Sequence, residues 1–98
     1  MIFQEEEYPQ LWILFAAYFF AAADEYAHSA EEVLAEYSAD VGQPRVVATL
    51  AELDRMLLKP VVWASAVEEA NRYFATATEI QQWLLFLRDK LALISESS

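Results

Sequence analysis

The chain has 98 residues, 57% of them apolar, and its 16 acidic residues against 6 basic ones give a formal net charge of −10. This length permits one small domain, and the absence of cysteine excludes disulfides and thiolate metal sites. One glycine in the whole chain disfavours β-hairpins. We predict a single all-α domain over residues 1–98, a compact bundle of about five helices with a buried aromatic first helix. Residues 1–7 and 95–98 are expected to be disordered tails.

The first predicted helix begins at Pro9 and runs to about residue 23. Proline suits the first position of a helix, where the backbone N–H has no partner within the helix. The uncharged stretch 11–23 would span only about 20 Å as a helix, against roughly 30 Å of bilayer hydrocarbon. Glutamates occupy positions 5–7, where a signal peptide needs positive charge. We therefore expect a buried central helix in a cytoplasmic protein, without a membrane span. Its expected core residues are Trp12, Phe15, Tyr18, Phe19 and Phe20. The alternative for Tyr18, and for Tyr26 after the helix, is an anchor in a partner interface, where tyrosine is favoured.

A second helix is predicted by a capping pattern in which Ser29 is followed three residues later by Glu32. The helix should run to about Asp40, and Gly42 fits the position just after its end. The residues expected to be buried are Val33, Leu34 and Tyr37.

A third helix is predicted to start at Pro44 and to end before Pro60. Its apolar residues recur every three or four positions, which is the spacing of an amphipathic helix. They are Val46, Leu50, Leu53 and Leu57.

Two further capping patterns, Ser65 with Glu68 and Thr76 with Glu79, predict a short helix to about residue 73 and a long last helix. The last helix carries one apolar stripe, because its large side chains again recur every three or four positions. They are Ile80, Trp83, Leu84, Leu87, Leu91 and Ile94.

The residues that could carry chemistry are few. His28 is the only histidine, and Glu25 lies three residues before it. A carboxylate-bridged metal bundle needs two such Glu-x-x-His pairs and two more glutamates, so we predict no metal site and a surface or capping role for His28. One glycine cannot build a phosphate-binding loop. We expect no enzyme, no cofactor and no direct nucleic-acid binding, since a strongly acidic chain repels phosphates.

The charge of the chain is distributed unevenly. The first 44 residues hold nine acidic side chains and no Lys or Arg, whereas the other 54 hold seven acids and six bases. In the second helix, acids at positions 32, 36 and 40 lie on one face and repel each other. Such a surface attracts a positively charged partner. The residues predicted to bind this partner are Asp24, Glu25, Tyr26, Glu31, Glu32, Glu36 and Asp40, with Glu5, Glu6 and Glu7 as further candidates.

The order and spacing of several short motifs resemble a small all-helical family of immunity proteins from bacterial contact-dependent growth inhibition systems. The resemblance covers about residues 8–92. Its motifs are Tyr8-Pro9-x-Leu11, Ala17-Tyr18-Phe19, Glu25-Tyr26, Ser29-Ala30-Glu31-Glu32-Val33, Leu50-Ala51-Glu52-Leu53-Asp54-Arg55-Met56-Leu57 and Gln82-Trp83-Leu84.

This resemblance implies an inhibitor that binds the cognate toxin domain delivered by a neighbouring cell. Toxins of these systems are frequently nucleases with basic clefts, which agrees with the acidic half of this chain. Two alternatives stay open from the sequence: an acidic mimic of nucleic acid that binds a host protein, and a helical scaffold subunit. We expect a monomer or a weak homodimer. Leu85 and Phe86 lie off the apolar stripe, and two roles stay open for them: packing on a neighbouring helix, or a dimer contact.

Overall fold

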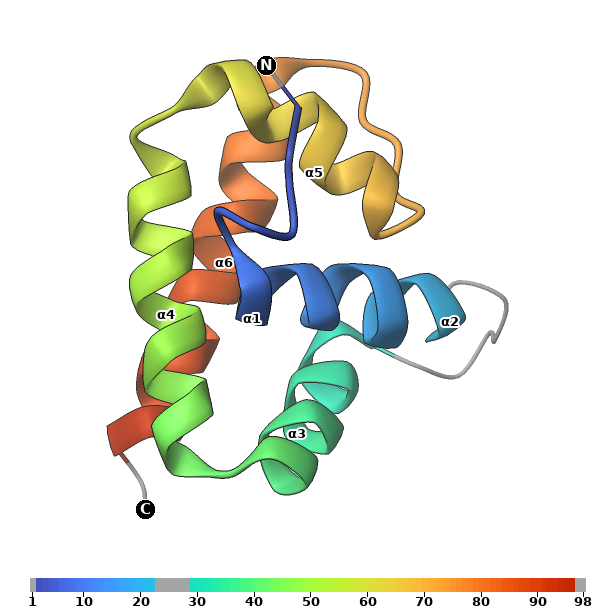
Figure 1. Ribbon diagram of the computed structural model, residues 1–98. Coiled ribbons are helices and arrows are strands. Elements are labelled where there is room, and N and C mark those ends of the chain that lie inside the picture. Colours follow the sequence, from blue (N-terminus) through green and yellow to red (C-terminus); the bar gives the residue numbers. More distant parts are fainter. Residues whose placement is uncertain (1, 23–28, 97–98) are drawn as a thin grey trace.

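The chain forms helices joined by short connections, as Figure 1 shows for the computed structural model, which describes residues 2–22 and 29–96. No strand occurs within these residues, and the all-α prediction is confirmed. The elements are α1 (Pro9–Ile13), the π-helix η1 (Leu14–Phe19), α2 (Phe20–Ala22), α3 (Ala30–Val41), α4 (Gln43–Leu57), the 3-10 helix η2 (Pro60–Val62), α5 (Trp63–Glu69) and α6 (Ala77–Glu96).

The first helix, which comprises α1, η1 and α2, passes through the middle of the bundle (Figure 1). Pro9 starts it, as predicted. Helices α3 and α5 both pack against its η1 part, and α1 packs against α4. Phe15 and Phe19 are buried, but Phe20 is 50% exposed, so its assignment to the core was wrong. Phe20 follows Phe19 by about 100° around the helix, which turns it away from the buried side.

Helices α3 and α4 meet at Gly42, which ends the first and begins the second. Its φ of 84° lies in the left-handed region that favours glycine. At the start of α3 the N–H of Glu32 donates to Ser29 Oγ at 3.2 Å, which confirms the predicted cap. The residues by which α3 packs into the core are Val33, Leu34 and Tyr37.

Helix α5 differs from its prediction at both ends. It begins at Trp63, directly after η2, so Ser65 lies inside the helix and does not cap it. The Ser65 hydroxyl instead accepts the N–H of Phe3 at 3.0 Å. The helix ends at Glu69 rather than near residue 73, because Asn71 takes a left-handed φ of 56°. The N–H groups of Asn71 and Arg72 then bond back to the last turn, as in a Schellman motif.

Helix α6 begins where the sequence predicts, and its predicted apolar stripe faces the core. Thr76 Oγ1 accepts the N–H of Glu79 at 3.2 Å, and the Glu79 carboxylate accepts the N–H of Ala75. The helix runs through Ser95 to Glu96, past the predicted start of a tail. Its buried residues are Ile80, Leu84, Leu87 and Leu91. They form the core together with α4, which lies alongside (Figure 1).

The segment before the first helix is tied to the core by Phe3. This side chain, within the stretch 1–7 expected to be disordered, is only 3% exposed and stacks on Tyr8 and Trp12 with ring centroids 5.6 Å away in each case. The aromatic cluster continues to Phe15 and, through Phe15, to Trp83 of α6.

Candidate partner-binding surface

Helix α3 carries the predicted partner-binding residues that the structure describes. Their side chains are all exposed, and α3 contains no Lys or Arg. These residues are Glu31, Glu32, Glu36 and Asp40. The remaining predicted residues, Asp24, Glu25 and Tyr26, lie outside the described residues, as does His28.

The four carboxylates of α3 do not form one cluster. Glu32, Glu36 and Asp40 recur every four residues and make a strip along the helix, which we call the acidic strip. Glu31 lies nine residues before Asp40 and therefore about 180° away around the axis. Neighbouring elements confirm this division. The Tyr18 hydroxyl of η1 donates to Asp40 Oδ2 at 2.8 Å, whereas Glu31 Oε1 lies 3.7 Å from Lys90 Nζ of α6.

Within the acidic strip, the carboxylates of Glu32 and Glu36 pair with no other side chain among residues 2–22 and 29–96. Asp40 lies in the last turn of α3, where the helix dipole disfavours an anion. The hydrogen bond from Tyr18 offsets part of that cost. The strip therefore presents two unpaired carboxylates and one that is already hydrogen-bonded.

The N-terminal acids lie apart from α3. Figure 1 shows the segment before α1 on the α5 side of the first helix, whereas α3 packs on the other side. Glu5 and Glu6 are exposed. The backbone carbonyl of Glu7 accepts a bond from Arg55 at 3.0 Å, and the Arg55 guanidinium lies 5.3 Å from the centre of the Tyr8 ring. Among the described residues of the first half of the chain, the acidic side chains are thus divided between two regions.

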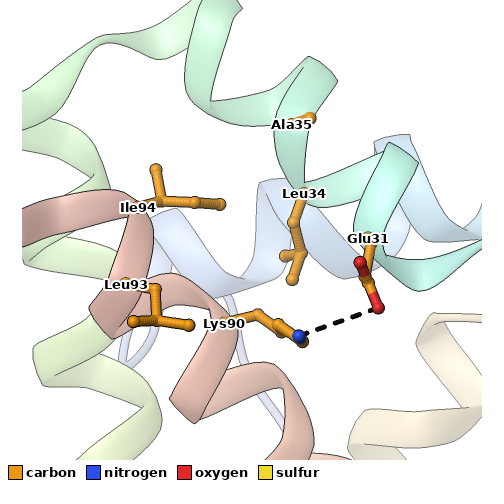
Figure 2. A pocket seen from close by; sticks show the side chains of 6 residues that line it. All are labelled: Glu31, Leu34, Ala35, Lys90, Leu93 and Ile94. Atoms are coloured by element: carbon orange, nitrogen blue, oxygen red, sulfur yellow. Dashed lines mark ion pairs between the residues drawn. The ribbon is translucent and has the colours of Figure 1, made fainter. Parts of the chain in front are cut away.

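A groove between α3 and α6 borders Glu31 (Figure 2). Its volume is about 200 Å³, and apolar side chains from both helices face one another across it. The sequence did not predict this groove, because it depends on how the two helices pack. The lining residues are Glu31, Leu34, Ala35, Lys90, Leu93 and Ile94.

Among residues 2–22 and 29–96, no three carboxylate or imidazole side chains gather where they could hold a metal ion. Over the same residues, no helix has both the length and the apolar character that crossing a membrane requires.

The family described as CdiI immunity protein matches residues 7–91 of the chain. The chain belongs to this family. The match runs from the residue before Tyr8 to Leu91 of α6, and it confirms the resemblance seen in the sequence. No curated protein and no solved structure matches the chain. Membership identifies a toxin-neutralising immunity protein, whose partner is a cognate toxin.

Glu52 is a buried residue of this immunity protein that the sequence analysis did not single out. It is only 7% exposed, and its Oε1 accepts the N–H groups of Gln10 and Leu11, both at 2.9 Å. Burial raises the pKa of Glu52, while these two hydrogen bonds and the nearby Arg55 lower it. Tyr8, the residue before α1, supplies no side-chain cap. Glu52 of α4 therefore caps the first helix. The sequence carried no signal for this role, because Glu52 lies about 120° around the helix from the centre of the predicted apolar face.

The hydrogen bond between Tyr18 and Asp40 can be tested in the immunity protein through the pKa of Tyr18. It is the largest cause that raises the pKa of Tyr18 above its ordinary value of 10.0, and the charge of Glu36 adds to it. We expect Asp40→Ala to lower the pKa of Tyr18 towards 10.0, measured by NMR with ring-labelled tyrosine. Glu32→Ala is the control and should leave the pKa unchanged. An unaltered Tyr18 pKa in the Asp40 variant would show that the bond does not form in solution.

Proposed function

We propose that this immunity protein acts in the cytoplasm and neutralises the toxin domain of a contact-dependent growth inhibition system by binding it through the outer face of α3. We further propose that the toxin is a nuclease and that the carboxylates of α3 dock at its basic substrate cleft. In this proposal the chain is an inhibitor without catalytic activity or a cofactor.

The observation that carries the proposal is the composition of α3. Four of its 12 residues are acidic and none is basic. Like charges four residues apart destabilise a helix by roughly 0.2–0.5 kcal/mol for each pair, and the acidic strip contains two such pairs. A cationic partner would offset this repulsion, because its positive charges would lie against the unpaired carboxylates and attract them.

Charge complementarity supports the proposal that the toxin is a nuclease. A protein that holds nucleic acid needs Lys and Arg side chains that face the phosphates. A row of carboxylates on a rigid helix can occupy the same cationic surface. Complementary charge should also speed association and make it sensitive to salt.

The test is a titration of the cognate toxin domain with the double variant Glu32→Lys/Glu36→Lys. We expect binding to weaken about tenfold or more, equivalent to about 1.4 kcal/mol, because two attractive charges become repulsive. Calorimetry measures the affinity, and a nuclease assay on the same mixtures measures inhibition. Circular dichroism should show an unchanged fold, since both side chains are exposed.

Glu68→Lys/Glu69→Lys on α5 is the matched control. Both double variants replace two carboxylates by two ammonium groups and so change the net charge from −10 to −6. The control should bind almost as tightly as the wild type. Equal weakening of both variants would mean that overall charge, rather than α3, attracts the toxin. Unchanged affinity of the α3 variant would place the binding surface elsewhere.

A further inference from the structure

We propose that the groove between α3 and α6 receives one apolar side chain of the toxin domain, and that a basic toxin residue beside it takes the place of Lys90 on Glu31. This inference rests on the proposed function and locates within it the contact that holds the complex together.

The groove has the character of an anchor site. Leu34 and Ile94 form its apolar walls from α3 and α6, and Leu93 lies at its side with 59% of its surface exposed (Figure 2). Ala35, at its edge on α3, is exposed and small, so the groove is open towards solvent. Large apolar side chains left exposed beside a concave surface favour contact with another protein.

The size of the groove fits a side chain better than a small molecule. Its volume is about 200 Å³, whereas pockets for drug-sized ligands have about 300–1,000 Å³. A cavity of about 150 Å³ is enough to hold benzene. One aliphatic or aromatic side chain of the toxin would therefore fill it.

The ion pair at the edge of the groove can be exchanged. Glu31 and Lys90 lie 3.7 Å apart, and their side chains are 62% and 35% exposed. Pairs as exposed as this one contribute little to stability. Lys90 also has a second partner, because its Nζ lies 5.5 Å from the centre of the Phe86 ring. A guanidinium or ammonium of the toxin can thus bind Glu31 while Lys90 remains over Phe86.

The groove and the acidic strip border the same outer face of α3. Ala35 lies about 40° from Glu31 around the axis, and Glu36 lies about 100° further on. A basic partner that covers this face would contact both. In such an interface the charges mainly accelerate association, and a buried apolar anchor mainly slows dissociation.

The test uses the cognate toxin domain and three variants of the full chain. Ala35→Trp fills the groove from its edge, and Leu93→Ala removes one of its apolar side chains. We expect each to weaken binding about tenfold, mainly through faster dissociation. Lys90→Met removes the cation that competes for Glu31. It should tighten binding about threefold, which corresponds to the usual free energy of one exposed ion pair.

Ala51→Trp on α4 is the matched control, because Ala51 is an exposed helical alanine outside the groove. It should bind like the wild type. Absence of binding by the wild type would refute the proposed function itself. Wild-type binding with unchanged dissociation for Leu93→Ala, or for a folded Ala35→Trp, would refute the groove alone. Weaker binding by Lys90→Met would refute the exchange at Glu31.

Discussion

Replacing Phe3 by alanine is expected to lower the free energy of unfolding by about 3–5 kcal/mol, the usual cost of removing a buried phenyl ring. The ring is almost fully buried and contacts Tyr8, Trp12 and Phe15. Removal of the ring would leave a cavity beside the start of the first helix. The segment before this helix would then lose its attachment to the core. Urea denaturation followed by tryptophan fluorescence measures the change.

Ile2→Ala provides the control for this variant. Ile2 is the neighbouring residue and is 62% exposed, so its truncation should change stability by less than about 0.5 kcal/mol. If Phe3→Ala were equally mild, the N-terminal segment would not be part of the core in solution.

Replacing Glu52 by alanine is expected to lower the free energy of unfolding by about 2–4 kcal/mol, because each buried donor left without an acceptor costs roughly 1–3 kcal/mol. The two donors are the N–H groups of Gln10 and Leu11. Glu52→Gln keeps a side-chain oxygen at the same position and should lower the free energy of unfolding by less than Glu52→Ala does. Chemical denaturation of the three proteins decides, and equal stability of Glu52→Ala and the wild type would contradict the capping role.

The ionisation of Glu52 adds a pH dependence with a definite sign. Burial raises the pKa of Glu52 above 4.5, so the folded chain keeps this proton at pH values where the unfolded chain has lost it. The contribution of Glu52 to stability is therefore complete below pH 4.5 and falls as pH rises through the raised pKa. Glu52→Gln lacks this titration. The stability of the wild type relative to Glu52→Gln should decrease as the pH rises above 4.5, and an increase would contradict the raised pKa.

Much of the fold could be predicted because its signals are local. Pro9 at a helix start, the caps at Ser29 and Thr76, and Gly42 after α3 act through bonds within a few residues. The periodicity of α6 predicts its buried side for the same reason. Such features depend on residues nearby in the sequence and hardly on contacts with distant ones.

The errors arose where a distant residue decides the outcome. Ser65 matches a capping pattern, but the preceding η2 already starts the helix and the Ser65 hydroxyl bonds to Phe3, 62 residues away. Phe3 itself gave no sign of burial, because its partners belong to elements that only folding brings near. The π-helical turns of η1 were not predicted either, since a run of apolar residues fits α- and π-helix equally.

The candidate site shows the same limit. Exposure of the four α3 acids followed from helical periodicity, and the structure agrees. The partners of Asp40 and Glu31 belong to η1 and α6, so neither the hydrogen bond to Tyr18 nor the ion pair with Lys90 could be read from spacing. Spacing alone places Glu31 about 180° from Asp40 around the helix, but only the structure shows which neighbouring element each of them meets.

The division of α3 into a buried side and an outer side has an evolutionary consequence. Val33, Leu34 and Tyr37 anchor the helix, while Glu32 and Glu36 have no role in the core. Under the proposed function, folding and toxin specificity are encoded by different positions of one short segment. If α3 binds the toxin as proposed, a lineage would acquire protection against a new toxin through substitutions on the exposed side of α3, because these leave the core unchanged.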